Sequence, residues 1–545
     1  MKRASASTIP WLLLLPSLAF AGFFPRPVID VGPPNDEYSL LDVDVTATNG
    51  WGTFDQLIDH SNASLGTFKQ RYWYGTQYWK GPGSPIIYFN PGEQSATNFN
   101  NTFMTNSRLT GLFAEAVGGA VVMTEHRYWG ESSPYDTLTI DALQHLTVEN
   151  SIKDNIYFAK NWVPPFDDSG ESAPDKAPWV FSGGSYTGAM AHWMLNTEPG
   201  TFWAYHSTSG TLEAIRDFWQ YFRPLQEATP TNCSNDLNAA MVYIDNLLLN
   251  GTEQEKFELK DKFMLGDQED GDFASWLEVG PWTWQSTQFY TESVKGYNDY
   301  YRFCDYIENV WPGSGNEVPG PEGVGKDKAI DGYARWMTEQ YMAGLCEASG
   351  YPEWQGTYNT ACFALSNASS PMYTDLSVDN FAGRQWDWML CNEPLLYWQT
   401  GAPKSESKTL VPRTASADYW ENVMCNLVFP EGRFGLSNGK TVEDYNNYTS
   451  GWAGEYSEDA RIMDANGQFD PWRDATLSSV DRPGGPMQST PEHPIRVIPG
   501  GMHCSEYYKN NWDVNEETKN IAYEEVETLK GWIDEFYKAK RKAQA

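Results

Sequence analysis

Basic residues are scarce in this chain, which has 545 residues. Lysine and arginine together number 38 against 72 aspartate and glutamate residues, so the formal net charge is −34 at pH 7. A charge of this size opposes contact with nucleic acid or with an anionic membrane, and we expect neither as a partner. Acidic conditions would relieve the repulsion among the carboxylates, but a solvated acidic surface in a neutral medium explains the same charge.

Long apolar runs are missing after the first 21 residues, which argues against a membrane-spanning helix. The opening sequence MKRASASTIPWLLLLPSLAFA places two basic residues before a short apolar stretch and ends in small residues. This order is typical of a secretory signal peptide over 1–21, which an N-terminal extension over 22–50 follows. We therefore expect a secreted, extracellular protein, with a vacuolar or lysosome-like compartment as the alternative.

Cysteine is also infrequent, since seven residues allow at most three disulfides within one chain and leave one thiol. We expect the odd cysteine to be Cys504, beside His503, and the pairing of the other six stays open. Six Asn-X-Ser/Thr sequons would carry N-linked glycans in an exported protein. They lie at Asn62, Asn100, Asn232, Asn250, Asn367 and Asn447.

Short apolar runs that end in glycine, asparagine or proline alternate with helical patterns along the chain. This alternation predicts a parallel sheet that helices cover on both faces, with ligands at the carboxyl ends of its strands. The expected strands lie within 84–93, 118–126, 177–184, 459–468 and 493–501; we also expect a hairpin over 54–74 with a turn at Gly66, a helix over 146–162, and an amphipathic closing helix over 515–540.

The middle of the chain differs in pattern from both ends. Residues 211–424 combine helical stretches with a Gly/Pro-rich loop at 313–325 and carry no clear strand signal. We therefore predict an α/β core made of residues 51–210 and 425–545, which a mainly helical cap insertion over 211–424 interrupts.

One short stretch, WVFSGGSYTGAMAHW at 179–193, places a serine at a sharp turn from a strand into a helix. Gly183, Gly184 and Gly188 surround Ser185, as expected where side chains would collide with the neighbouring strand and helix. This is the layout of a nucleophile elbow, although Thr187 stands where the usual pattern G-x-S-x-G has glycine. A purely structural turn is the alternative, so the stretch alone does not establish a catalytic serine.

Histidine is rare, with seven residues, and this shortens the search for a general base. In this fold class the chain order is serine, acid, histidine, which leaves four candidates after Ser185. His192 lies on the helix that leaves the elbow, His206 precedes any acid of the core, and His493 begins a strand. We expect structural roles for these three. His503 follows a strand, at the edge of the sheet where ligands bind, and is the predicted base.

The predicted acid is Asp470 in the motif NGQFDPW, which follows the preceding strand. Asp464 lies inside that strand, and Asp474 stands where a helix could begin. The carboxylate of Asp470 would hold the imidazole tautomer and stabilise the imidazolium. An oxyanion hole needs two backbone donors, which we expect at Tyr186, directly after the serine, and at Gly92 or its neighbours in the loop NPGEQ.

Seven motifs follow one another along nearly the whole chain after residue 54: FDQLIDH with TFKQRYW, NPGE, EHRYWGESSP, GGSYTG, WDWMLCNEP, NGQFDPW and GGMHC. In identity and order they resemble the proline-specific serine peptidases that include lysosomal Pro-X carboxypeptidase and dipeptidyl peptidase II. Within that family the chain is most similar to the secreted fungal prolyl endopeptidases. Seven motifs in one order are a far more specific signal than the elbow alone.

The resemblance implies an α/β-hydrolase core with a helical cap, and hydrolysis on the carboxyl side of proline without a metal or an organic cofactor. It implies Ser185, Asp470 and His503 as nucleophile, acid and base, in agreement with the positional argument. It also implies that Trp472 and Tyr507 wall the proline pocket, since aromatic rings pack well on a pyrrolidine ring.

Two other features have less specific interpretations. Glu93, beside the expected oxyanion loop, is a candidate for binding the free amino end of a substrate. The motif EHRYWGESSP at 125–134 is best interpreted as a buried, ion-paired loop that supports the elbow.

The substrate is therefore expected to be a proline-containing peptide or protein, cleaved by a monomer or homodimer. Dipeptidyl peptidase or Pro-X carboxypeptidase action is the first alternative to endopeptidase action; a secreted esterase or lipase and a noncatalytic binding protein come after it. Acidic working pH is expected, and it requires a lowered pKa for His503, which burial under the cap would favour.

Overall fold

The computed structural model describes residues 49–99, 102–395, 397–453 and 460–544. The expected signal peptide, the extension up to residue 48 and the sequon at Asn100 lie outside the described residues. Across the four described ranges, no helix is both long enough and apolar enough to cross a membrane.

The described chain forms one eight-stranded sheet in the order β1-β2-β4-β3-β5-β6-β7-β8. The first three strands of that order pair antiparallel, and every later pair is parallel. The strands are β1 (Asn49–Leu57), β2 (Thr67–Gly75), β3 (Ile86–Phe89), β4 (Ala120–Thr124), β5 (Trp179–Gly184), β6 (Ala204–Thr208), β7 (Ile462–Gly467) and β8 (Ile495–Ile498).

The predicted strands and hairpin are confirmed, since each expected run contains one strand and β1 and β2 form the hairpin. The central strands β3, β4 and β5 are buried along their whole length, because helices cover them on both faces, whereas β1 alternates mainly between exposed and half-buried residues. The strand β6 was not predicted.

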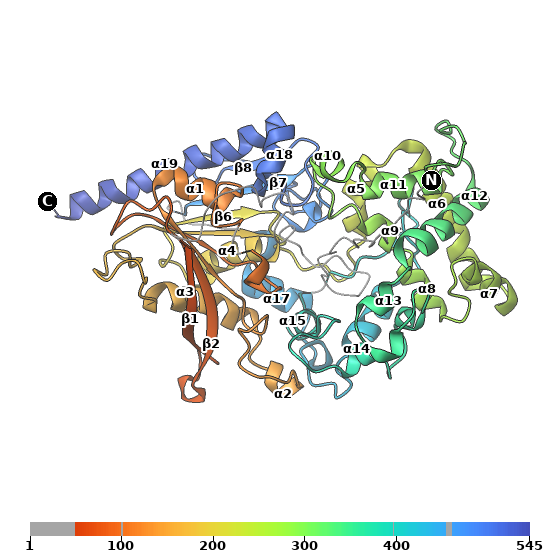
Figure 1. Ribbon diagram of the computed structural model, residues 1–545, viewed down its shortest axis with the longest axis horizontal. Helices are drawn as coiled ribbons and strands as arrows, with labels where there is room; N and C mark the ends of the chain where they lie inside the picture. The colour runs from red at the N-terminus through yellow and green to blue at the C-terminus, as the bar shows by residue number, and fades with distance from the viewer. Residues whose placement is uncertain (1–48, 100–101, 396, 454–459, 545) are drawn as a thin grey trace, which may run out of the picture.

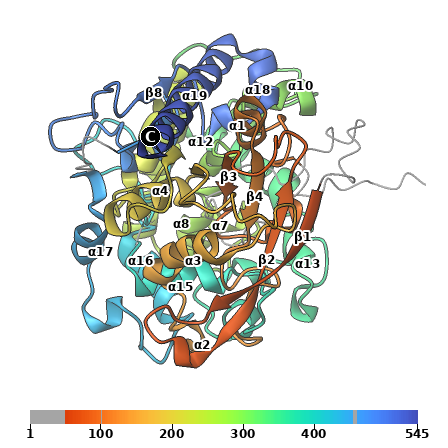
Figure 2. The same ribbon diagram turned by 90° about the vertical axis from the view of Figure 1, so that its left-hand side faces the viewer.

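Helices cover both faces of the sheet (Figure 1, Figure 2). On one face, α1 (Leu109–Val117) packs with the long closing helix α19 (Glu516–Gln544), whose buried side chains repeat at helical spacing. On the other face lie α3 (Val148–Asn161) and α4 (Tyr186–Thr197). The mainly parallel sheet, its strand order and its two helical layers are those of an α/β-hydrolase core, as predicted.

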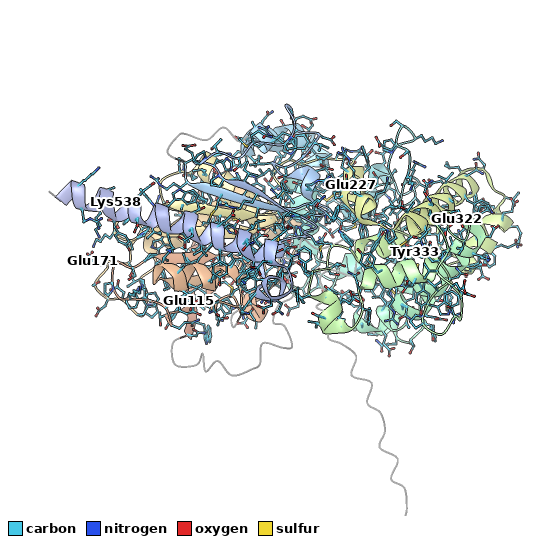
Figure 3. The ribbon with its side chains drawn as sticks, turned by 90° about the horizontal axis from the view of Figure 1, so that it is seen from above. Glu115, Glu171, Glu227, Glu322, Tyr333 and Lys538 are labelled. Atoms are coloured by element: carbon cyan, nitrogen blue, oxygen red, sulfur yellow. A yellow bond between two sulfur atoms is a disulfide. The ribbon has the colours of Figure 1, made fainter. Side chains whose placement is uncertain are left out.

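The segment between β6 and β7 is helical and contains no named strand among its described residues. Figure 3 shows it from above, with Glu227, Glu322 and Tyr333 on this part and Lys538 on α19. Its helices are α5 (Phe222–Ala228), α6 (Thr231–Asn250), α7 (Glu253–Asp261), α8 (Asp270–Trp276), α9 (Val279–Trp282), α10 (Thr291–Lys295), α11 (Asp299–Ile307), α12 (Lys326–Trp336), α13 (Leu345–Ala348), α14 (Pro371–Thr374), α15 (Arg384–Asn392), α16 (Ala417–Glu421) and α17 (Val442–Thr449). Two short helices, α2 (Ile140–Leu143) and α18 (Lys509–Val514), lie outside it.

Three disulfides tie this helical segment together, and the prediction of three disulfides with one spare thiol is confirmed. Cys504 is the free cysteine, and it is buried beside the predicted base. The pairs, which the sequence left open, are Cys233–Cys304, Cys346–Cys362 and Cys391–Cys425.

Two of the histidines with expected structural roles meet at one buried carboxylate. His192 Nε2 lies 2.8 Å from Asp464 Oδ1, and His493 Nε2 lies 2.7 Å from Oδ2. Burial alone would raise the pKa of Asp464, but the charges and hydrogen bonds of the two histidines outweigh it and hold that pKa below its usual range. The cluster thus joins α4 to β7 and to the start of β8.

The variant Asp464→Asn is expected to lose about 3–5 kcal/mol of stability, because it removes the charge that two buried histidines share. The measurement is the midpoint temperature of thermal unfolding. Asp513→Asn is the matched control, since Asp513 is exposed and, in the part of the chain that the structure describes, pairs only with Lys509 one helical turn away. Equal midpoints for the two variants would contradict the structural role of Asp464.

Candidate active site

Ser185 lies at the tight turn between β5 and α4, in a backbone conformation that serine rarely adopts. Its φ of 58° and ψ of −122° turn the chain so sharply that the flanking positions have no room for side chains. A Cβ on Gly183 would lie 2.1 Å from the carbonyl oxygen of Thr187, and one on Gly188 would lie 2.8 Å from that of Thr208. Gly183 and Gly188 are therefore required by this turn.

Ser185, His503 and Asp470 form one hydrogen-bonded row. Ser185 Oγ lies 2.9 Å from His503 Nε2, and His503 Nδ1 lies 2.9 Å from Asp470 Oδ1. When Nδ1–H donates to the carboxylate, Nε2 is the acceptor for the serine hydroxyl. All three side chains are at most 2 % exposed. The structure thus brings together the three residues that the sequence analysis selected for catalysis.

The acid and the base stand in loops at the carboxyl ends of neighbouring strands. Asp470 follows β7, and His503 follows β8, at the same edge of the sheet as the turn at Ser185. Asp470 Oδ1 also accepts a hydrogen bond from the backbone N–H of Trp472, at 2.9 Å. This second bond fixes the carboxylate in the orientation that faces the imidazole.

Burial and charge act in opposite directions on His503. Desolvation alone would lower the pKa of the imidazole, but the charge of Asp470 and its hydrogen bond to Nδ1 outweigh burial, so the pKa of His503 lies well above its ordinary value. This direction is opposite to the lowered pKa expected for work at acidic pH. His503 is buried, but the expected lowering of its pKa is wrong because the buried carboxylate of Asp470 dominates.

One expected oxyanion donor is engaged elsewhere. Gly92 lies against the elbow, since a Cβ there would be 3.2 Å from the Thr187 side chain, but its N–H donates to Asn90 Oδ1 at 2.8 Å. The Gln94 N–H donates to the carbonyl of Gly92. The expectation of Gly92 as the donor is therefore corrected. Tyr186 is the first residue of α4, where the helix itself does not use the N–H.

The two expected pocket residues lie apart. Trp472 packs in an aromatic cluster beside Asp470, with ring centroids 5.7 Å from Phe218, 5.4 Å from Tyr221 and 5.2 Å from Tyr397. Tyr507 belongs to the core on the α1 and α19 side, where its hydroxyl lies 2.8 Å from Ser182 Oγ.

Tyr507 is fully buried, and its ring faces Phe89, Phe103 and His206. The structure therefore does not place Tyr507 beside Trp472. The expectation that Tyr507 forms a wall of the proline pocket is corrected.

The loop at 125–134 is ion-paired and, over residues 125–129, buried, as expected. Glu125 accepts from the guanidinium of Arg71, with a shortest N–O distance of 2.6 Å, and Arg127 forms a buried ion pair with Asp154 at 2.5 Å. His126 Nε2 lies 3.1 Å from the hydroxyl of Tyr186. The loop therefore supports the side chain next to Ser185.

Acidic side chains surround Tyr186 as well. Burial raises the pKa of Tyr186 well above its ordinary value, and the charges of Glu93 and Glu393 add to this. Glu93 is buried and follows Gly92, and Glu393, on the cap, is half-buried. The structure thus places Glu93 near the elbow.

Two glutamines of the cap hold parts of the catalytic loops, and the sequence analysis missed both. Gln288 Nε2 donates to the carbonyl of His503 at 2.8 Å, and Gln285 Oε1 accepts from Trp472 Nε1 at 2.8 Å. They stand in the stretch WQSTQ, which has no periodicity or motif that marks them, and their partners are about two hundred residues further along the chain. No local signal identifies them.

The described sequons differ in exposure. Asn62, Asn250, Asn367 and Asn447 are exposed, whereas Asn232 is half-buried and its Nδ2 donates to Glu308 at 2.8 Å.

The comparison with known families decides between a hydrolase of unspecified substrate and a peptidase. The profile of the family described as serine carboxypeptidase S28 matches residues 56–520. This chain belongs to that family. It is a serine-type peptidase, as the resemblance of its motifs implied.

Relatives cover nearly the whole chain. Two serine proteases of Bipolaris victoriae, vicPa and vicPb, are 39% and 37% identical to it, over 92% and 94% of both chains. A probable extracellular serine carboxypeptidase of Arthroderma benhamiae is 28% identical over 86% of this chain and 64% of its own length.

Proposed function

We propose that this S28 peptidase cleaves peptide bonds on the carboxyl side of proline, with Ser185 as nucleophile, His503 as general base and Asp470 as the acid that orients the base. The observation that carries the proposal is the buried hydrogen-bonded row from Asp470 through His503 to Ser185, with the serine on a strained turn.

In the first step, Ser185 Oγ attacks the carbonyl carbon of a prolyl residue while His503 Nε2 takes the hydroxyl proton. Asp470 keeps the proton on Nδ1, so that Nε2 faces the serine, and its charge stabilises the imidazolium that forms. His503 then donates the proton to the leaving amine, and the acyl-enzyme remains on Ser185. Water, activated by the same histidine, releases the acid product.

Backbone amides stabilise the oxyanion in this scheme. The Tyr186 N–H points from the first turn of α4, whose positive end faces the negative charge that develops. We propose the Glu93 amide as the second donor because Glu93 follows Gly92, where an added Cβ would lie 3.2 Å from the Thr187 side chain and 3.5 Å from that of Tyr186. Donors of this kind are worth about 3–4 kcal/mol of barrier each.

Specificity for proline is supported by the aromatic cluster beside the acid. Trp472, Phe218 and Tyr221 pack their flat apolar rings against one another next to Asp470, and proline has no backbone N–H that would need a partner there. This proposal rests on Trp472 and the cap aromatics alone, without Tyr507.

The pH dependence of the reaction follows from His503. Only the neutral imidazole accepts the serine proton, and the pKa of His503 is raised, so kcat/KM is expected to fall as the pH drops below that raised pKa. The measurement is kcat/KM for a prolyl amide from pH 4 to 9, with an acid-side midpoint above about 6.5, the ordinary histidine value. A midpoint well below that value would contradict the assigned electrostatics of the Asp470–His503 pair.

Exopeptidase action is the second candidate, because the triad is fully buried and carboxylates lie near it. We propose that Glu93 binds the free amino end of the substrate. Glu93→Gln is then expected to lower kcat/KM about 10- to 100-fold for peptides with a free amino end, as for a lost charge-assisted hydrogen bond, and to leave amino-blocked peptides unchanged. An equal loss on both substrates would contradict this role.

A peptide with one internal proline, blocked at both ends, separates the two candidates. Wild-type protein is incubated with the blocked and the unblocked peptide, and the products are weighed by mass spectrometry. Cleavage of the blocked peptide after proline indicates an endopeptidase, and cleavage of the unblocked peptide alone indicates an exopeptidase. Cleavage at residues other than proline, or hydrolysis of esters alone, would contradict the proposed specificity.

We also propose that the protein is secreted. The signal-peptide pattern, the three disulfides and the exposed sequons support this, as does the likeness to a relative described as extracellular. The exposed sequons at Asn62, Asn250, Asn367 and Asn447 are the proposed glycan sites.

A further inference from the structure

Three buried side chains meet behind the catalytic loop. His206 lies on β6, Glu506 lies three residues after His503 in a short 3-10 turn (Ser505–Tyr507), and Glu525 lies on α19. All three are 0 % exposed, and one potential ligand atom from each lies within 4.8 Å of the other two. They come from three elements that pack on the α1 and α19 side of the sheet.

The polar atoms of this cluster lack the well-formed hydrogen bonds that buried polar atoms usually make. Among the described residues, the oxygens of Glu506 and Glu525 and His206 Nε2 make no hydrogen bond of normal geometry, although the Thr208 hydroxyl faces Glu506. Buried carboxylates that stay ionised in natural proteins are paired with a cation or bind a metal, and others take up a proton. Within the described chain, the one ion-pair contact within this cluster is His206 Nε2 to Glu525 Oε1, at 3.6 Å.

The orientation of His206 points its free nitrogen at the carboxylates. Nδ1 lies 2.9 Å from Ser182 Oγ, which lies 2.8 Å from the hydroxyl of Tyr507. When Nδ1–H donates to Ser182, the lone pair of Nε2 faces Glu525. Two lone pairs in contact repel each other unless a cation lies between them. A histidine held through its other nitrogen is the usual arrangement in metal sites.

The distances fit a metal ion better than a hydrogen bond. A separation of 3.6 Å between Nε2 and Oε1 is too long for an N–H···O bond. Two ligands at about 2.1 Å from a tetrahedral Zn²⁺ ion are about 3.4 Å apart, which is close to this separation. One imidazole and two carboxylates form a donor set that Zn²⁺ accepts, and the two negative charges balance the ion.

We propose that His206, Glu506 and Glu525 bind one divalent transition-metal ion, with Zn²⁺ as the best match. A carboxylate that binds through both oxygens, or the hydroxyl of Thr208 that faces Glu506, completes the coordination. The ion would tie the loop after His503 to β6 and to the closing helix. Its role is structural, since it lies outside the hydrogen-bonded row of the triad, and it is independent of the proposed specificity.

Metal analysis of the full-length protein tests this proposal without reference to activity. Protein is purified without a polyhistidine tag, and its metals are measured by inductively coupled plasma mass spectrometry. Wild type is expected to carry one Zn²⁺ ion per chain, and Glu525→Gln less than about a tenth of that. Glu527→Gln is the matched control, because Glu527 lies on the exposed side of the same helix, and it is expected to keep the ion.

If Glu525→Gln does not fold, the thermal unfolding midpoint of wild type with and without Zn²⁺ still tests the proposal. Stripping wild type with a strong chelator is expected to lower the midpoint by at least about 2 °C, and added Zn²⁺ is expected to restore it. Wild type that carries no transition metal and whose midpoint does not respond to Zn²⁺ would overturn the proposal, and the two glutamates would then share a proton. One Ca²⁺ ion in place of Zn²⁺ would also overturn the transition-metal assignment.

Discussion

Ser185→Ala is expected to lower kcat for prolyl amides by about 10⁴- to 10⁶-fold, because the nucleophile is lost while the binding surfaces remain. Alanine lacks only the hydroxyl and fits the same turn, so the fold and KM are expected to change little. The residual rate over uncatalysed hydrolysis would come from the oxyanion donors and from substrate positioning. The measurement is single-turnover and steady-state hydrolysis of a prolyl amide by carefully separated wild-type and variant protein.

A second serine controls for nonspecific effects of removing a buried hydroxyl. Ser172 is as completely buried as Ser185 and stands before β5, outside the hydrogen-bonded row. Ser172→Ala is expected to keep kcat within a few-fold of wild type. Equal kcat values for Ser185→Ala and wild type would contradict the assignment of the nucleophile, whatever the outcome for Ser172.

Asp470→Asn is expected to lower kcat by about 10⁴-fold. An asparagine amide keeps the shape of the carboxylate, but it can donate a hydrogen bond to His503 Nδ1. The imidazole then carries its proton on Nε2, where it can no longer accept the proton of Ser185. The buried carboxylate that raises the pKa of His503 is also lost, so any remaining activity is expected to extend to lower pH than in wild type.

A variant of the neighbouring Asp474 is the control that separates a loss of catalysis from a loss of fold stability. It is also fully buried, but its Oδ2 lies 3.3 Å from the guanidinium of Arg223 and does not belong to the row. Asp474→Asn is expected to lower the unfolding midpoint while kcat changes by less than about 10-fold. A loss of kcat from Asp474→Asn as large as that from Asp470→Asn would contradict the choice of Asp470.

The sequence predicted the parts of the site that depend on the edge of the sheet. Short apolar runs locate the strands, and the rule that loops at their carboxyl ends carry function selected Ser185, Asp470 and His503. Those residues do lie within hydrogen-bonding distance. The loop at 125–134 was predictable for a related reason, since several charged residues beside a buried strand need partners.

Other details depend on geometry that a linear pattern does not carry. Tyr507 lies four residues after the base, but the short turn between them directs its ring to the opposite face of the sheet. The Gly92 N–H is taken by the side chain of Asn90, which sequence spacing does not reveal. Desolvation alone predicted a lowered pKa for His503, whereas the buried Asp470 carboxylate reverses the direction. The cluster at His206 combines three distant segments, and β6 itself was not predicted.

The central claim is that Ser185 is the activated nucleophile of this peptidase, and covalent labelling tests it most directly. Wild-type protein is treated with a fluorophosphonate, which reacts with serines that a neighbouring base activates, and the labelled peptide is identified by mass spectrometry. We predict one phosphonyl group per chain, on the peptide that contains residues 179–193, and no label on Ser185→Ala. A label on another serine, or equal labelling of wild type and Ser185→Ala, would contradict the account.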